Sequence, residues 1–230
     1  MTLTEKKIFA IGDIHGCHSK LVTLLGRIPL DKGRDTLFFL GDYINRGPDS
    51  RKVVDTLLQI EASYGHVIFL MGNHEQALLE YAATGDVEVL PALRSMGVEA
   101  TLASYGTSLR GLRDLAGLPP EHRDFLHALK FSSVIDNYLF THADIDEEGI
   151  ALAKARPDAL EAQRSAAAGL LASRRFAQEH IADTGYTVIF GHLPFEAPLV
   201  MTNRIGIDTG AVYGGVLTAV ELPALHFYHA

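Results

Sequence analysis

The first third of the chain alternates between short apolar runs and segments with helical spacing. The apolar runs cover residues 8–11, 36–40 and 67–71, lengths that suit strands buried on both faces. Between the first two runs, apolar residues recur at helical intervals, at Leu21, Leu24, Leu25 and Ile28. This alternation predicts a β-α-β-α-β unit, and therefore a parallel sheet.

The pattern changes after this unit. Residues 86–130 contain helical patches without a cluster of reactive side chains, and we interpret them as a helical insertion. Residues 149–182 are rich in alanine and are predicted to be mostly helical. Short strands are predicted at 132–136, 138–141, 187–190, 199–201, 205–207, 216–221 and 225–229. Strands after a βαβ half predict a second sheet packed on the first, in an α/β (α+β) fold.

Composition and charge narrow the class of protein. The 230 residues show no internal repeat or linker, so we expect one domain over 1–230. With 20 basic and 28 acidic residues, the net charge of −8 argues against a broad nucleic-acid surface. Cys17 is the only cysteine, which excludes an internal disulfide and fits a reducing compartment. No signal peptide or membrane span is evident, so we expect a cytoplasmic protein without a membrane partner.

Metal-binding side chains follow the predicted strands. The first three strands run into GDIHG at 12–16, GDYINRG at 41–47 and GNHE at 72–75. Two later strands run into histidines, His142 and His192. The carboxyl ends of parallel strands meet at one edge of a sheet, where such a fold assembles a site. The candidate metal ligands are therefore Asp13, His15, Asp42, Asn73, His142 and His192.

This set of ligands suits two metal ions better than one. One ion takes about 4–6 ligands, so six residues with a shared carboxylate suit a pair about 3.5–4 Å apart. Asp42 follows the middle strand and is the natural bridge. A bridging hydroxide would attack phosphorus in line, Arg46 would hold the phosphate oxygens, and His74 would protonate the leaving oxygen. Each motif alone is typical of a structural turn; their combination indicates a phosphoesterase site.

The motifs resemble those of the calcineurin-like metallophosphoesterases. The chain is most similar to the branch that holds phosphoprotein phosphatases and symmetrical diadenosine tetraphosphatases, and the match extends to IDTGAVYGG at 207–215. The resemblance implies a four-layer α-β-β-α sandwich and two divalent ions, usually manganese, iron or zinc. It implies Asp13, His15 and Asp42 on one ion, and Asp42, Asn73, His142 and His192 on the other. Substrate contacts would come from Arg46, Arg174 and Asn73, although Arg175 is a competing choice for Arg174.

Three positions depart from the family pattern. Asn45 stands where the family has an aspartate that orients the acid histidine, and Ala172 replaces a tryptophan. Asp144 replaces a glycine, and we expect it to face solvent or to add negative charge at the metal rim. An amide at Asn45 can orient His74 but supplies no charge, so we predict weaker acid catalysis and a preference for good leaving groups.

These observations lead to a ranked set of functions. The leading prediction is a metal-dependent phosphomonoesterase of the serine/threonine protein phosphatase type, acting on a phosphoprotein. The alternative is a symmetrical dinucleoside tetraphosphate hydrolase. The third is a metal-binding or phosphate-sensing protein with little catalysis. A cysteine phosphatase is excluded, because Thr23 stands where an arginine would follow Cys17.

Overall fold

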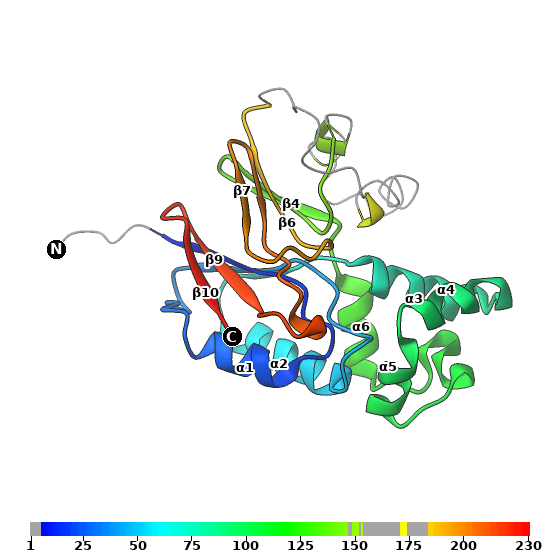
Figure 1. The fold of residues 1–230 in the computed structure, drawn as a ribbon. Helices are drawn as coiled ribbons and strands as arrows, with labels where there is room; N and C mark the ends of the chain where they lie inside the picture. Colours follow the sequence, from blue (N-terminus) through cyan, green and yellow to red (C-terminus); the bar gives the residue numbers. More distant parts are fainter. Residues whose placement is uncertain (1–5, 147–148, 152, 154–170, 174–183) are drawn as a thin grey trace.

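The computed structural model describes residues 6–146, 149–151, 153, 171–173 and 184–230, whose strands form two five-stranded sheets packed face to face (Figure 1). The first sheet has the order β10-β9-β1-β2-β3. Within this sheet β1, β2 and β3, the three strands from the start of the chain, are parallel to one another, as predicted. Their bounds, with those of the two late strands, are β1 Ile8–Ile11, β2 Thr36–Phe39, β3 Val67–Phe69, β9 Thr218–Leu222 and β10 His226–His229.

The second sheet has the order β4-β5-β6-β8-β7. Strands β5, β6 and β8 are parallel, and the edge strands β4 and β7 are antiparallel to their neighbours. The bounds are β4 Ser132–Ile135, β5 Tyr138–Thr141, β6 Thr187–Phe190, β7 Leu199–Met201 and β8 Arg204–Gly206. The late strands β9 and β10 do not extend this sheet. They return to the open edge of β1, where β9 pairs antiparallel, so both sheets are mixed.

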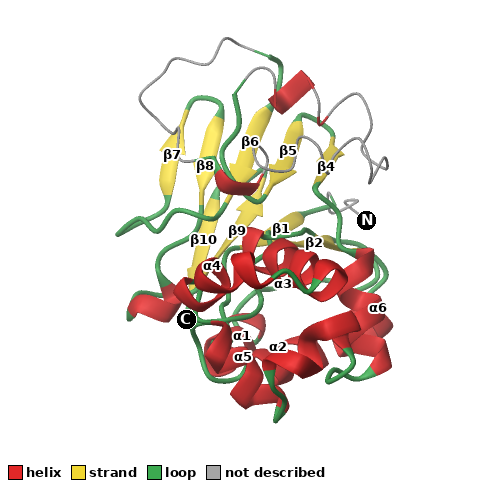
Figure 2. Cartoon of the chain, turned by 90° about the vertical axis from the view of Figure 1, so that its right-hand side faces the viewer, coloured by secondary structure: helices red, strands yellow, loops and turns green. Residues whose placement is uncertain are grey.

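Helices cover the outer face of the first sheet and extend beyond it (Figure 2). The connecting helices are α1 His18–Leu25, α2 Ser50–Ser63 and α3 Asn73–Thr84. The region interpreted as an insertion contains η1 Val87–Val89, α4 Leu90–Ser95, α5 Val98–Tyr105, η2 Leu109–Leu115 and α6 Pro120–Ala128. Most of 149–182 lies outside the described residues.

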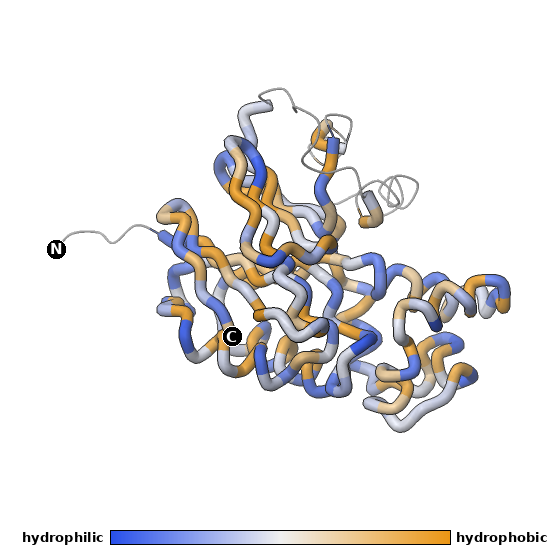
Figure 3. The backbone as a smooth tube through the Cα atoms, viewed as in Figure 1, coloured by the Kyte–Doolittle hydropathy of each residue, from blue (hydrophilic) through white to orange (hydrophobic). Residues whose placement is uncertain are grey.

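The first-half strands are continuously apolar because both of their faces are buried. Phe38 points between the sheets, where its ring stacks on Phe140 at a centroid distance of 3.7 Å. Leu37 and Phe39 point to the other face, into the core beneath the helices. Figure 3 shows the resulting apolar strands in the middle of the molecule. A strand buried on both faces cannot alternate polar and apolar residues, which explains the sequence pattern.

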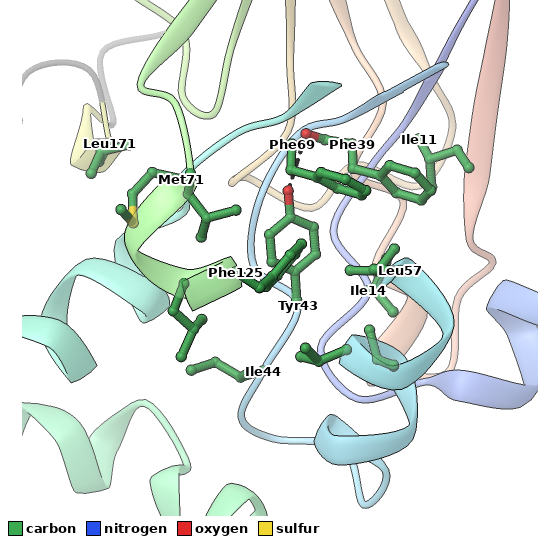
Figure 4. Close-up of a cluster of buried hydrophobic side chains, with 14 of the residues drawn as sticks. Ile11, Ile14, Phe39, Tyr43, Ile44, Leu57, Phe69, Met71, Phe125 and Leu171 are labelled. Carbon is green, nitrogen blue, oxygen red and sulfur yellow. Dashed lines mark hydrogen bonds between the residues drawn. The ribbon is translucent and has the colours of Figure 1, made fainter. Parts of the chain in front are cut away.

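Tyr43 fixes the loop that follows β2 within this core. Its ring packs edge-on against Phe69 and Phe125, as Figure 4 shows. Its hydroxyl donates to the carbonyl oxygens of Phe39, at 3.2 Å, and Leu70, at 2.7 Å. The residue next to Asp42 is therefore anchored by both packing and hydrogen bonds. None of the helices in the described ranges is long and apolar enough to cross a membrane.

Candidate active site

Asp42 lies at the centre of a buried group of histidines. It follows β2, the strand between β1 and β3, and its side chain is only 2% exposed. Its Oδ2 lies 3.3 Å from Nε2 of His15, and its Oδ1 lies 3.5 Å from Nε2 of His142. The two oxygens of one carboxylate thus face histidines from the two different sheets, which is the arrangement a bridging ligand needs.

Asn73 and His192 complete the side of the group that faces the second sheet. Oδ1 of Asn73 lies 3.0 Å from Nε2 of His142 and 3.0 Å from Nδ1 of His192. The ligand atoms of Asp42, His142 and His192 all lie within 4.8 Å of one another. This cluster coincides with the set predicted for the second ion.

On the side of the group that faces β1, the residues that come together differ from the set predicted for the first ion. The ligand atoms that lie within 4.8 Å of one another there belong to His15, Asp42 and His74. Asp13 is buried nearby, and its carboxylate accepts the backbone N–H of His192 at 3.1 Å from each oxygen. The structure therefore brings all six predicted ligands into one region, and it adds His74, which the sequence prediction assigned to acid catalysis.

Two of the histidines are oriented by backbone carbonyls. Nδ1 of His15 donates to the carbonyl oxygen of Ile44 at 3.0 Å, and Nδ1 of His142 donates to that of Leu40 at 2.8 Å. Each bond leaves Nε2 directed toward Asp42 as a potential metal ligand. Burial lowers the pKa of His15 to about 3 and that of His142 to about 4, so both imidazoles are neutral, which is the form that binds metal.

The carboxylates around these histidines are held close together away from water. Burial raises the pKa of Asp42 to about 7 and that of Asp208 to about 6. Burial and the nearby charges of Asp208 and Asp42 raise the pKa of Asp13 well above its usual value. Neighbouring buried carboxylates repel one another unless cations lie between them. Carboxylate and amide oxygens beside neutral imidazoles are a donor set that fits manganese, iron or zinc.

Asp208 and Glu75 were not identified from the sequence. Asp208 follows β8, so it stands at a strand end like the predicted ligands, and that signal was available. Glu75 is fully buried, and its two oxygens accept backbone N–H groups from Asp42, Tyr43, Ile44 and Gly72 at 2.9–3.2 Å. It therefore shapes the loop that carries Asp42, a role that no local pattern reveals.

Glycines are required where the ligand loops approach each other. A Cβ added at Gly72 would lie 2.2 Å from Oδ1 of Asp42, and one added at Gly191 would lie 2.1 Å from Oδ1 of Asp13. Neither carboxylate could keep its position beside such an atom. The glycines that precede Asn73 and His192 are thus a condition for bringing the strand ends together.

His74 and Asn45 are in direct contact, as expected from the family pattern in which this position orients the acid histidine. Nδ2 of Asn45 lies 3.0 Å from Nδ1 of His74, whose side chain is 1% exposed. Oδ1 of Asn45 accepts the hydroxyl of Thr101 at 2.7 Å. Burial lowers the pKa of His74 well below its usual value, and the positive charge of Arg46 adds to this effect. Thr101, which lies on α5, was not identified because its partner is distant in sequence.

Arg46 lies at the open side of the group. Its Nη1 donates to Nε2 of His15 at 2.8 Å, and its guanidinium carbon lies 5.2 Å from the centre of the Tyr213 ring. Arg174 and Arg175, the competing second arginines, lie outside the described residues.

Asp144 does not occupy the position predicted for it. It is 1% exposed and accepts a hydrogen bond from Nη1 of Arg204 at 2.9 Å. The paired guanidinium compensates its charge, so it neither faces solvent nor adds a bare charge at the metal rim. The two residues are 60 positions apart, which is why the pair was not foreseen.

Comparison with known proteins gives the family. The model of the calcineurin-like phosphoesterases matches residues 6–214, most of the chain. The chain belongs to this family. It is therefore a phosphoesterase of the metallophosphoesterase superfamily, in agreement with the resemblance found in the sequence and with the sandwich fold.

Related sequences cover nearly the whole chain. The chain is 26% identical over 233 residues to "Bis(5'-nucleosyl)-tetraphosphatase PrpE [asymmetrical]" of Halalkalibacterium halodurans, covering 94% of this chain and 90% of the relative. It is 27% identical to the protein of the same name from Anoxybacillus flavithermus, with the same coverage.

Solved structures share the fold. A putative diadenosine tetraphosphatase has a TM-score of 0.63 and 23% identity, covering 100% of this chain and 95% of its own. A serine/threonine phosphatase from Saccharomyces cerevisiae has a TM-score of 0.61 and 12% identity, covering 96% and 74%. At these identities the likeness shows the fold alone, so it does not separate the two predicted activities.

Proposed function

We propose that this phosphoesterase hydrolyses dinucleoside tetraphosphates. The proposal reverses the ranking made from the sequence, which placed a serine/threonine protein phosphatase first. Its support comes from relatives named as tetraphosphatases that match 94% of the chain. Their names specify asymmetrical cleavage, whereas the alternative from the sequence was symmetrical cleavage. We take asymmetrical cleavage as the proposed reaction.

Two divalent ions would be held at the buried group around Asp42. Asp13, His15 and Asp42 would bind one ion, and Asp42, Asn73, His142 and His192 would bind the other. We propose manganese as the metal, with iron and zinc as alternatives. When bound, the two ions would neutralise phosphate charge and lower the pKa of a water that attacks phosphorus.

Arg46 would bind the phosphate chain. In this structure its guanidinium donates to Nε2 of His15, the nitrogen that would ligate an ion. One lone pair cannot serve both, so metal binding at His15 would release Arg46. The free guanidinium would then offer paired donors to phosphate oxygens, a geometry that arginine matches well.

The contact between Asn45 and His74 is the observation that favours a polyphosphate over a serine phosphate. A carboxylate beside Nδ1 would stabilise a protonated imidazole, but the Asn45 amide supplies no charge there. A serine alkoxide needs a proton in order to leave. A nucleotide phosphate, with a second pKa of about 6, leaves as an anion and depends less on the acid.

Parallel assays of manganese-loaded protein with diadenosine tetraphosphate and with a phosphoserine peptide test the proposal. We expect a higher kcat/KM for the dinucleotide. Ion-exchange chromatography of the products distinguishes AMP plus ATP, from asymmetrical cleavage, from two molecules of ADP. Faster turnover of the peptide would restore the protein phosphatase as the better candidate. Metal binding without turnover of either compound, or of an aryl phosphate, would support the third candidate.

A further inference from the structure

An open groove adjoins the candidate site on the side of Arg46. It has a volume of about 630 Å³, and its walls are largely apolar, with Pro194, Phe195, Tyr213 and Val216, although Glu196 also lines it. Volumes of this order hold drug-sized ligands, and apolar walls of this kind suit a flat ring. The phosphate chain of a dinucleotide would occupy only the part near Arg46, so the groove offers room for a group beyond it.

Tyr213 connects the groove to the site. Its side chain is 61% exposed, although one face of the ring lies 5.2 Å from the guanidinium carbon of Arg46. An exposed tyrosine at the mouth of an apolar groove provides a large, rigid ring surface. Because Tyr213 lines the groove and also contacts Arg46, a ligand held by both residues would have its anionic and aromatic parts adjacent.

The loop that carries Tyr213 is held in place at both ends. At its start, Oδ1 of Asp208 accepts the backbone N–H of Gly210 at 2.9 Å. At its end, the hydroxyl of Thr209 donates to the carbonyl oxygen of Val216 at 2.6 Å. Lys20 on α1 donates to the carbonyl oxygens of Ala211, at 2.8 Å, and Gly215. An aromatic ring on a fixed loop binds a partner with little loss of conformational entropy.

We propose that Tyr213 and this groove bind a nucleobase of the substrate by stacking, while Arg46 holds the adjoining phosphate. This inference rests on the proposed function and specifies how the same site distinguishes a nucleotide from a phosphate chain without bases. A stacked base contributes about 5- to 150-fold in affinity, and any base can stack because each has a flat face.

The test compares diadenosine tetraphosphate with inorganic tripolyphosphate, which lacks bases. In the metal-loaded protein, Tyr213→Ala should lower the ratio of the two kcat/KM values by about 5- to 150-fold. Tyr213→Phe, which keeps the ring, should preserve the ratio. Tyr64→Ala is the matched control, because Tyr64 also lies beside a cation, 4.6 Å from Nζ of Lys32, but does not line the groove. Equal losses for both compounds would show that Tyr213 acts only through Arg46, and would overturn the inference.

A binding measurement separates this inference from the proposed function. Calorimetric titrations of the metal-loaded protein with AMP and with ribose 5-phosphate compare ligands that differ in the base alone. We expect AMP to bind more tightly by a similar factor, and Tyr213→Ala to remove the difference. If the protein hydrolyses no dinucleotide but retains this preference, the proposed function fails and the groove assignment stands. Equal affinities for the two ligands would overturn the groove assignment, whatever the hydrolysis assays show.

Discussion

The substitution Glu75→Gln preserves the size of the side chain. It replaces a carboxylate that accepts four backbone N–H groups with an amide. Oε1 of Glu75 accepts the N–H groups of Tyr43 and Ile44, and Oε2 accepts those of Asp42 and Gly72. An amide has one oxygen, so either orientation leaves two N–H groups facing an NH2 group. No water reaches them, since Glu75 is 0% exposed.

The expected loss of stability follows from those two donors. A buried donor without an acceptor costs about 1–3 kcal/mol, so Glu75→Gln should lower the free energy of unfolding by about 2–6 kcal/mol. For a chain of this size, each kcal/mol lowers the melting temperature by about 2–4 °C, which gives a decrease of about 4–24 °C. Metal affinity should fall as well, because the same bonds shape the loop that carries Asp42.

Thermal unfolding followed by circular dichroism measures this loss. Glu80→Gln is the matched control, because Glu80 lies on the same helix but is exposed. Burial, aided by the charge of Asp42, raises the pKa of Glu75 to about 8 in the metal-free protein. Below that pH the folded carboxyl takes up a proton, whereas the unfolded one keeps its ordinary pKa of 4.5, so the wild type gains stability as the pH falls. The variant lacks this group, so the gap between wild type and variant should widen from about pH 9 to about pH 6. If Glu75→Gln has the same melting temperature as the Glu80→Gln control at both pH values, the argument is refuted.

Three further predictions concern the metals and the acid. Asp42→Asn should reduce the bound manganese below two ions per chain and lower turnover of an aryl phosphate at least about 100-fold, as elemental analysis and kinetics would show; full metal content would contradict the bridging role. Folded pKa values of about 7 for Asp42 and about 6 for Asp208 exceed their ordinary 3.8, so the folded metal-free protein binds the extra protons. Above about pH 6.5, His15 and His142 are neutral in both the folded and the unfolded chain, so the melting temperature should fall as the pH rises from about 6.5 to about 8, and manganese should reverse the fall; a flat profile in that range would exclude the raised pKa of Asp42. Asn45→Asp should raise rates on alkyl phosphates about 10-fold relative to aryl phosphates, and an unchanged dependence on leaving-group pKa would exclude the role given to the amide.

The strands and their ligand-bearing ends could be predicted because their signals are local. Residues 36–39 are all buried, as a continuous apolar run requires, and Asp42 follows within three positions. Because consecutive strands pair in parallel, Asp42 lies close to His15 on one side and to the chain near Asn73 on the other. A glycine and a ligand after each of the first three strands carry this information without any knowledge of distant contacts.

Features set by distant pairings could not be predicted. Strand β9 joins β1 across more than 200 positions because the edge of β1 is open, and no local pattern chooses that edge. The bond between Thr101 and Asn45 spans 56 positions, and that between Asp144 and Arg204 spans 60. In each case the residue type allowed a partner, but only the folded chain determines which one.

Backbone strain links the helical segment 86–130 to the chemistry of the site. The left-handed φ values between 46° and 70° found at the site belong to His15, Asp42, Asn45, Arg46 and His192. Each such residue costs about 1–3 kcal/mol, and glycine would remove the cost only by deleting a functional side chain. Surrounding hydrogen bonds must therefore hold the strained loop, and for Asn45 and Arg46 they come from this helical segment.

The supporting bonds reach the strained loop from the segment around α5. The N–H of Asn45 donates to Thr101, and the N–H of Arg46 donates to the carbonyl oxygen of Gly97 at 3.2 Å. Gly97 itself has a φ of 77°, and a Cβ there would lie 3.1 Å from the Arg46 nitrogen. The helical segment is therefore in close contact with the loop at Gly97. It holds Asn45, which contacts His74, and Arg46, the candidate phosphate ligand. Substitutions in α5 should therefore reduce catalysis even where they leave the two sheets intact.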